Sequence, residues 1–325
     1  MSLAPITIAI HTFGRELRDD LVRDVRAGLG ADPKSLPPRW FYDERGSELF
    51  EAITRLPEYY QTRTETAILR EAAPDVIARV RPEALVELGA GSAEKTRLLI
   101  EPAIRDRLSC FVPFDISEAF LQQAARRLAA DFPGLAVYAV VGDFSMHVDR
   151  VPRHGQQLVV FLGSTIGNFE DEQRAVFLRQ VRDLLQPGDA FLLGVDLVKD
   201  EAELVAAYDD AAGVTAEFNL NVLRVLNREL GADFDLGAFE HVATFDRERS
   251  RIEMRLRTHG PRRVTIPGAE MVVEFAAGEA LLTEISVKFT RESIQRELEA
   301  AGMDVARWYT DPRQRFALAL STPEV

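Results

Sequence analysis

Apolar and polar residues follow two alternating patterns between residues 84 and 198. Short apolar runs, typical of buried strands, cover 84–90, 110–117, 135–144, 158–168 and 189–198. The segments 93–104, 118–132 and 171–188 instead repeat apolar residues at helical spacing, and the last of them ends at Pro187-Gly188. Apolar strands that alternate with helices predict an α/β fold in which helices cover both faces of a parallel sheet.

The C-terminal region is expected to extend this sheet in a different way. Residues 293–322 fit one helix followed by two strands joined by a short turn, which predicts an antiparallel end to the sheet. A long segment, roughly 199–282, interrupts the pattern before this ending. We therefore assign residues 20–198 and 287–325 to the sheet domain and residues 199–286 to an inserted domain.

Composition narrows the range of partners. The 325 residues carry a net charge of −13, from 39 basic and 52 acidic side chains. Nucleic acid and anionic membranes both require a basic face, so neither is an expected partner. Cys110 is the single cysteine and cannot form an internal disulfide, which fits a reducing cytoplasm. ITIAI at 6–10 is too short for a signal peptide, and no apolar run approaches the length of a membrane span.

A glycine-containing turn follows the first predicted strand. The stretch from Gly89 to Thr96, GAGSAEKT, nearly matches a phosphate-binding loop and half-matches the dinucleotide fingerprint. Both patterns fail at Glu94, where each requires a glycine and where a carboxylate would repel phosphate oxygens. The remaining pattern is an acid, Glu87, followed by Gly89 and Gly91. A tight turn after a strand is the alternative explanation for these glycines.

Acidic residues also follow the next two predicted strands. Asp115 ends the second strand, where a carboxylate can accept ribose hydroxyl groups, and Asp143-Phe144 ends the third. Asp143 offers an acceptor to an adenine amino group, and Phe144 offers a ring to its face. Such a site suits a nucleoside that carries positive charge and no phosphate. S-adenosylmethionine, with its sulfonium and ammonium groups, fits this description.

Longer blocks of sequence resemble a known enzyme family. The blocks are LPEYYQTRTE, VFLGSTIGN, LVKDEAELVAAYDDAAGVTAEFN and LLTEISVKF. They are similar to those of the bacterial L-histidine Nα-methyltransferases of ergothioneine biosynthesis, and the resemblance extends from about residue 33 to FALAL at 316–320. The first twenty or so residues lie outside it. The resemblance implies a Rossmann-like class I S-adenosylmethionine-dependent methyltransferase fold whose inserted domain recognises the substrate.

The resemblance also implies an activity and a set of site residues. The family trimethylates the α-amino group of L-histidine to hercynine with three S-adenosylmethionine molecules, the first step of ergothioneine biosynthesis. Tyr42 is expected near the reacting amine. The implied cofactor residues are Gly89, Lys95, Asp115, Asp143 and Phe144. The implied substrate residues are Tyr59, Asn168, Tyr208, Glu284 and Ser286. We expect a cytoplasmic monomer that binds histidine and its mono- and dimethylated forms, and no metal is implied.

Several of these residues have simpler explanations. Lys95 alone would be a solvated lysine at a helix start. Tyr59 lies just before Thr62-x-x-Glu65, which has the form of a capping box opening a helix, so packing would explain it. Asn168 would be a turn residue or helix cap, although it follows the carboxyl end of a strand, where open α/β sheets bind ligands. Tyr208 would be an ordinary tyrosine on an amphipathic helix.

The stretch TEISVKF is the most informative of the implied substrate segments. Its alternation places Glu284, Ser286 and Lys288 on one face of a strand and the apolar residues on the other. The simpler explanation is a solvated strand face. The functional one is a carboxylate beside a hydroxyl, which matches an imidazole because that ring offers one N–H donor and a second nitrogen.

Three functions remain open at this level. The first is histidine Nα-trimethylation. The second is the same scaffold acting on another aromatic amino acid, such as tryptophan. Glu284 and Met254 favour histidine, because an indole has no second ring nitrogen. The third is a cofactor-binding regulatory module without turnover. Met254 and Phe218 match family positions near the pocket, and core packing explains both equally well.

Overall fold

The computed structural model describes residues 6–11 and 14–324, with the backbone alone at 14–16, 144 and 145. These residues form two units. The sheet unit contains 6–11, 61–198 and 288–324, and the insertion unit contains 14–60 and 199–287. The sequence-based boundaries differ from this division, since they placed 20–60 and residue 287 with the sheet. Leu21, Val25 and Phe41 instead share a hydrophobic core with Val222 and Leu226 of the insertion.

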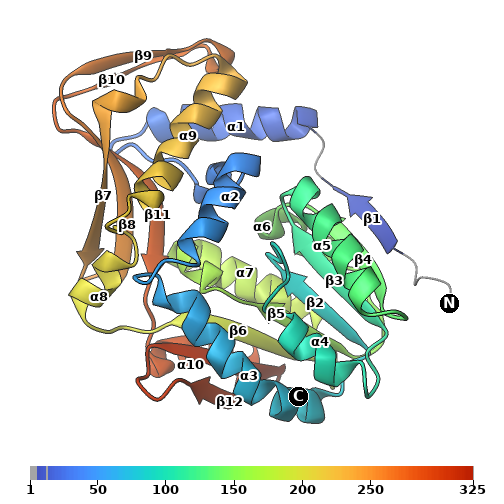
Figure 1. Ribbon diagram of the computed structural model, residues 1–325. Helices are drawn as coiled ribbons and strands as arrows, with labels where there is room; N and C mark the ends of the chain where they lie inside the picture. Colours follow the sequence, from blue (N-terminus) through green and yellow to red (C-terminus); the bar gives the residue numbers. More distant parts are fainter. Residues whose placement is uncertain (1–5, 12–13, 325) are drawn as a thin grey trace. The chain divides into compact units, whose positions relative to one another are not determined.

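The sheet unit is built on eight strands in the order β1-β4-β3-β2-β5-β6-β13-β12 (Figure 1). Along this order, each strand from β1 to β6 pairs in parallel with its neighbour. Strand β13 is antiparallel to both of its neighbours, β6 and β12. The predicted parallel sheet with an antiparallel C-terminal end is therefore confirmed. The strands are β1 (Ile6–Ile10), β2 (Ala84–Leu88), β3 (Cys110–Asp115), β4 (Ala136–Val141), β5 (Gln157–Phe161), β6 (Ala190–Asp196), β12 (Met303–Thr310) and β13 (Phe316–Pro323).

The strands end earlier than the apolar runs suggested. The fourth predicted strand, 158–168, ends at Phe161, and Thr165–Asn168 forms a 3-10 turn, η3. The extra residues form the loops at the strand ends, where chain pairing stops and side chains become available for binding. Residues 6–10 were not predicted as a strand, yet they form β1, which pairs in parallel with β4 at the sheet edge.

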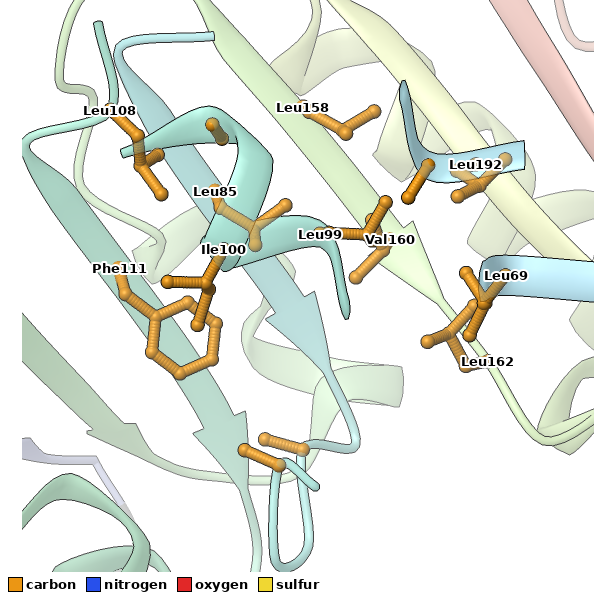
Figure 2. Close-up of a cluster of buried hydrophobic side chains, with 14 of the residues drawn as sticks. Leu69, Leu85, Leu99, Ile100, Leu108, Phe111, Leu158, Val160, Leu162 and Leu192 are labelled. Atoms are coloured by element: carbon orange, nitrogen blue, oxygen red, sulfur yellow. The ribbon is translucent and has the colours of Figure 1, made fainter. Parts of the chain in front are cut away.

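Helices cover the sheet and bury its central strands. They are α3 (Tyr60–Val80), α4 (Arg97–Ala103), α5 (Glu118–Asp131), α6 (Phe144–His147), α7 (Asp171–Leu184) and α10 (Arg291–Ala300), with the 3-10 turn η2 (Val148–Arg150). Figure 2 shows Leu69 of α3 and Leu99 and Ile100 of α4 among side chains of the strands. Leu85 and Val160, on the central strands β2 and β5, belong to the same buried cluster. This core holds the strand ends in register.

The insertion unit contains two small antiparallel sheets and several helices. One sheet has the order β11-β8-β7 and the other consists of β9 and β10. Helix α9 (Val214–Leu230) contributes Phe218, Val222 and Leu226 to the core. The remaining elements are α1 (Gly14–Leu29), η1 (Pro38–Phe41), α2 (Glu44–Ile53), α8 (Glu201–Ala206), η4 (Leu236–Ala238), β7 (Phe239–Asp246), β8 (Arg251–Thr258), β9 (Arg262–Ile266), η5 (Pro267–Ala269), β10 (Met271–Phe275) and β11 (Ala280–Val287).

Two classes of feature are missing from the described residues. None of their helices is both long and apolar enough to cross a membrane. Within the same residues, no group of histidine, cysteine and acidic side chains has the arrangement of a metal site.

Candidate functional site

The turn after β2 has the backbone shape that its glycines permit. Gly89 and Gly91 have φ angles of 69° and 50°, in the left-handed region. The N–H groups of Gly89 and Ala90 donate to the Phe114 carbonyl oxygen at 2.8 and 3.0 Å, which fastens the turn to β3. A Cβ atom at Gly91 would meet nothing within 4 Å, so this side of the turn is open. Glu94 is exposed, and its carboxylate lies 3.6 Å from the guanidinium group of Arg97.

Asp115 and Asp143 stand at the carboxyl ends of neighbouring strands. Asp115 accepts hydrogen bonds from the N–H groups of Gly91 and Ser117 at 2.8 and 2.9 Å. Burial raises the pKa of its carboxyl group, although these hydrogen bonds oppose the rise. Asp143 is buried and directly precedes α6. Phe144 opens that helix, and its side chain lies outside the described part of the chain.

Glu87 adds a third carboxylate from the end of β2. Its side chain is buried and accepts a hydrogen bond from the Thr96 hydroxyl through Oε1. Its Oε2 has no hydrogen-bond partner among the described residues. Burial raises the Glu87 pKa to about 8, while the Thr96 hydrogen bond and the positive charge of Lys95 oppose the rise. A buried acceptor without a partner is costly, so a cationic or N–H-bearing ligand would stabilise this group.

These groups fit S-adenosylmethionine. Strands β4, β3 and β2 are adjacent and parallel, so their carboxyl ends lie at one edge of the sheet. This edge contains Asp143 after β4, Asp115 at the end of β3 and Glu87 near the end of β2. Asp115 can accept hydrogen bonds from ribose hydroxyl groups and Asp143 one from an adenine amino group, while Glu87 can exchange a hydrogen bond with a polar group of the ligand. The open backbone at Gly91 leaves room for close approach.

Lys95 is not the solvated helix-start lysine of the simpler explanation. It precedes α4, which begins at Arg97, and its ammonium group forms an ion pair with Glu65. The Glu65 side chain is fully buried. The predicted capping box is wrong, because α3 already begins at Tyr60, so Thr62 lies inside the helix. Glu65 makes tertiary contacts and does not cap the start of the helix.

Asn168 closes the loop that follows β5. It is the last residue of η3 and is partly buried. The loop is fixed at its start by two bonds within the sheet unit. The Gly163 N–H donates to Glu65 Oε1 at 2.8 Å, and the Asp196 N–H of β6 donates to the Ser164 hydroxyl at 2.9 Å. Ser164 has a φ of 58°, which shows how tightly the chain turns here.

The insertion unit brings the predicted tyrosines into one row of aromatic rings. The Tyr42 ring lies 5.7 Å from that of Phe50 and 5.5 Å from that of Phe218, both edge to face. The Phe50 ring lies 6.2 Å from the Tyr59 ring, which lies 6.4 Å from the Tyr208 ring. Phe218 is fully within the core, so packing explains it. The row joins residues that are far apart in the sequence.

Tyr208 and Ser286 are in direct contact. Their hydroxyl oxygens lie 2.7 Å apart, and either group can donate. Tyr208 is not on a helix as predicted, because α8 ends at Ala206 and Tyr208 follows in a turn. Ser286 belongs to β11, where it pairs across from Ile252. The hydrogen bond therefore links the turn after α8 to β11.

Glu284 and Ser286 do not form a solvated strand face. Their exposed fractions are 9% and 3%, so that simpler explanation is wrong. Glu284 stands directly opposite Met254 of β8, which is buried. Lys288 lies beyond the end of β11, in the sheet unit, where its ammonium group is buried 3.0 Å from Asp196 Oδ2. The polar pair that remains on β11 is Glu284 and Ser286.

A buried network that sequence analysis missed supports this region. The Thr283 hydroxyl donates to Asn219 Oδ1 at 2.7 Å, and Asn219 Nδ2 lies 2.8 Å from His241 Nδ1. His241 Nε2 lies 2.8 Å from the Tyr208 carbonyl oxygen. Because the amide NH₂ of Asn219 can only donate, His241 must carry its proton on Nε2 and donate to Tyr208. Burial lowers the His241 pKa, which favours this neutral form.

Comparison with known proteins identifies the family of this chain. The sequence profile described as "Histidine-specific methyltransferase, SAM-dependent" matches residues 21–323. The chain is 52% identical over 318 residues to the histidine N-alpha-methyltransferase of Mycolicibacterium smegmatis, covering 97% of this chain and 99% of that protein. It is also 52% identical over 303 residues to the protein of the same name from Mycobacterium tuberculosis, covering 93% and 94%.

More distant proteins show weaker similarity. Ergothioneine biosynthesis protein 1 of Neurospora crassa is 31% identical over 286 residues, which cover 85% of this chain and 32% of that protein. A solved S-adenosylmethionine-dependent methyltransferase of Clostridium acetobutylicum has a TM-score of 0.46 and 11% identity, over 80% of this chain and 92% of that one. From the profile and the mycobacterial proteins, this chain belongs to the family of histidine-specific, S-adenosylmethionine-dependent methyltransferases.

Proposed function

We propose that this protein transfers three methyl groups from S-adenosylmethionine to the α-amino group of L-histidine and so makes hercynine, the first step of ergothioneine biosynthesis. The observation that carries the choice of substrate is the buried pair of Glu284 and Ser286 on β11. A buried carboxylate beside a buried hydroxyl group can exchange hydrogen bonds with a polar ring, which supports an imidazole as the group that they recognise. The matched family provides the reaction class.

The polar pair suits an imidazole ring. Glu284 accepts the ring N–H, and the Ser286 hydroxyl donates to the second nitrogen. Met254, directly across from Glu284, supplies an apolar wall beside the carboxylate. An indole has a single N–H and would leave the serine hydroxyl without its partner, so this arrangement favours histidine over tryptophan.

The α-carboxylate of the substrate is assigned to Asn168 and Tyr208, both of which can donate hydrogen bonds. This assignment has a consequence for the bond between Tyr208 and Ser286. That bond uses one of the two hydroxyl protons. If Ser286 donates to the imidazole and Tyr208 to the carboxylate, both protons must turn toward the substrate. Binding then replaces one internal hydrogen bond by two bonds to histidine.

Methyl transfer depends mainly on orientation. The amine lone pair must lie in line with the bond from sulfur to the methyl carbon, and such positioning can supply much of the rate. Tyr42 is assigned beside the amine as a hydrogen-bond partner or proton relay, because an ordinary tyrosine pKa of about 10 makes it a poor base near neutral pH. As methylation proceeds to a quaternary ammonium, the rings of Tyr42 and Tyr59 stabilise the positive charge by cation–π contact.

The cofactor is assigned to the sheet unit. S-adenosylmethionine supplies the electrophilic methyl group when bound. Asp115 and Asp143 hold its nucleoside, Gly89 allows the turn to approach, and Phe144 offers a ring to the adenine. Lys95 completes the assigned set. We further propose that the protein acts as a monomer in the cytoplasm, with histidine and its mono- and dimethylated forms as its small-molecule partners.

Mass spectrometry of a reaction with S-adenosylmethionine and free histidine tests the proposed function. The expected product is trimethylated histidine with three equivalents of S-adenosylhomocysteine. Tryptophan offered in parallel should remain unmodified. Methylation of tryptophan and not of histidine would indicate a different acceptor, and the absence of any product from a protein that binds S-adenosylmethionine would indicate a regulatory module.

Histamine tests the assigned carboxylate contacts. It keeps the imidazole and the amine but lacks the carboxylate, so the donors Asn168 and Tyr208 lose their partner. We expect kcat/KM for histamine to fall by at least a hundredfold relative to histidine, since two hydrogen bonds to a charged group contribute about 1.5–3 kcal/mol each. Comparable rates for the two compounds would show that these residues do something else.

Replacement of Asp115 tests the cofactor site. Asp115→Ala removes the acceptor assigned to the ribose hydroxyl groups, and we expect S-adenosylhomocysteine to bind about tenfold more weakly or worse. Titration calorimetry measures the affinity. Asp304→Ala, an exposed aspartate on the edge strand β12, is the matched control and should bind normally. Equal affinities for the parent and a folded Asp115→Ala protein would remove Asp115 from the site.

Replacement of Glu87 tests the effect of its raised pKa on stability. At pH values between the ordinary carboxyl pKa and about 8, Glu87 keeps its proton in the folded protein but loses it in the unfolded chain. The stability of the folded protein therefore falls as pH rises through this window. Glu87→Gln removes this loss. We measure the Tm of the variant and of the parent, both without cofactor. The difference between the two Tm values should shift in favour of the variant from about pH 5 to about pH 8. Glu94→Gln, an exposed residue of the same turn, should show no such gain. A pH-independent difference would contradict the assigned protonation.

Replacement of Glu284 tests recognition of the imidazole. A site built around polar partners rejects analogues that lack them by roughly 10⁴–10⁵. Glu284→Ala removes the carboxylate and opens space beside Met254, so histidine turnover should fall and activity on tryptophan should rise. The ratio of kcat/KM for the two amino acids is the measurement, and Glu274→Ala on the exposed side of β10 is the control. An unchanged ratio in a folded Glu284→Ala protein would mean that other groups bind the ring.

A further inference from the structure

A fully buried carboxylate, that of Glu65, joins two parts of the sheet unit that the proposed function uses separately. Its Oε2 forms the ion pair with the ammonium group of Lys95. Its Oε1 accepts the Gly163 N–H at 2.8 Å. Gly163 begins the loop that ends at Asn168. One side chain on α3 therefore contacts both an assigned cofactor residue and the loop of an assigned substrate residue.

The neighbouring strand leaves room for this carboxylate. Gly194 lies inside the buried strand β6, where glycine weakens a strand and usually marks the close approach of another group. A Cβ atom placed at Gly194 would overlap Glu65 Oε1 and lie 3.3 Å from Phe316. A side chain at this position would therefore displace the carboxylate or the strand. Gly194 is therefore an independent indication that the sheet leaves space for the Glu65 carboxylate.

The same face of α3 makes a second contact with this region. Gln61 lies one helical turn before Glu65, and its Nε2 donates to Asp196 Oδ2 at 3.0 Å. Asp196 in turn donates its N–H to the Ser164 hydroxyl, next to Gly163, and pairs with the buried Lys288. Helix α3 thus holds the start of the loop through two adjacent residues, Gly163 and Ser164. This restricts the positions that Asn168 can adopt.

A contribution to stability does not account well for a charged group at this place. A buried ion pair is often no more stabilising than apolar residues of the same volume, because desolvation offsets the attraction. What the pair provides is a fixed geometry. The Glu65 side chain has no exposed area, whereas the Lys95 side chain is 25% exposed. The carboxylate of Glu65 is therefore shielded from solvent, whereas part of the Lys95 side chain reaches the surface.

We propose that Glu65 is a positioning residue that couples the cofactor and substrate sites by orienting Lys95 and the Gly163–Asn168 loop together. The inference rests on the proposed function, because it uses the roles assigned to Lys95 and Asn168. Its physical core is that each carboxylate oxygen serves one partner. Replacing one oxygen by an amide NH₂ leaves one of the two donor partners facing another donor, and it deprives Lys95 of its opposite charge in either case.

Glu65→Gln is the variant that makes this change with little change in volume. In the full-length protein we expect the Kd for S-adenosylhomocysteine to rise about tenfold and the KM for histidine, at saturating S-adenosylmethionine, to rise several-fold. Lys95→Met should raise the Kd and leave the histidine KM within about twofold of the parent. The joint change in both constants distinguishes coupling from loss of the lysine contact alone.

The double variant Glu65→Gln with Lys95→Met provides the rescue. With no ammonium group to satisfy, the amide oxygen of the glutamine can accept the Gly163 N–H. We expect the histidine KM to return to within about twofold of the parent while the Kd stays weak. The buried pair is then neutral, so this variant also guards against misfolding of the single variants. Asp189→Asn, which removes the carboxylate partner of Arg153 at the opposite, amino end of β6, controls for loss of an ion pair and should change neither constant.

Three outcomes would overturn the positioning role. They are an unchanged Kd in Glu65→Gln, an unchanged histidine KM in Glu65→Gln, and a histidine KM in the double variant as high as in Glu65→Gln. Each applies to a parent protein that methylates histidine. A parent that binds S-adenosylhomocysteine but makes no methylated histidine would overturn the proposed function instead, so the two failures are distinguishable.

Discussion

The common direction of the parallel strands determines where chemistry can take place in the sheet unit. Strands β4, β3, β2, β5 and β6 run side by side in parallel, so the loops that follow them all emerge at one edge. That edge collects Glu87, Asp115, Asp143 and the loop that ends at Asn168. The hydrophobic core beneath holds these strand ends in place, which allows short loops to present polar groups in a defined arrangement.

Polar groups at this edge are buried at a cost that their partners offset. Glu65 has Lys95 and the Gly163 N–H, and Asp196 has Lys288 and Gln61. Glu87 differs, because one of its oxygens has no partner among the described residues and its pKa is raised to about 8. The satisfied groups hold the loops, whereas the unsatisfied one is suited to a ligand.

The insertion unit contains the polar groups that we assign to the recognition of a small polar ring. Glu284 and Ser286 are fixed on β11, and Tyr208 is fixed by its own hydroxyl and through its carbonyl oxygen by His241. Asn219 connects His241 to Thr283, the residue before Glu284. The polar groups assigned to the substrate are therefore supported by a second layer of buried hydrogen bonds, which limits their freedom before a ligand arrives.

The sequence alone determined the order of strands and helices between residues 84 and 198, the antiparallel ending and the acids after successive strands, because these follow from periodicity and from residues close together in the chain. The resemblance of long sequence blocks added the family and the site residues. Only the tertiary structure decided that residues 14–60 join the insertion, that Glu65 pairs with Lys95 and not with a helix end, and that Glu284 is buried. It also decided that Tyr208 contacts Ser286 and that Asn219 and His241 support them. These contacts join segments about 20 to 100 residues or more apart, and local patterns contain no information on which distant side chains fill the same space.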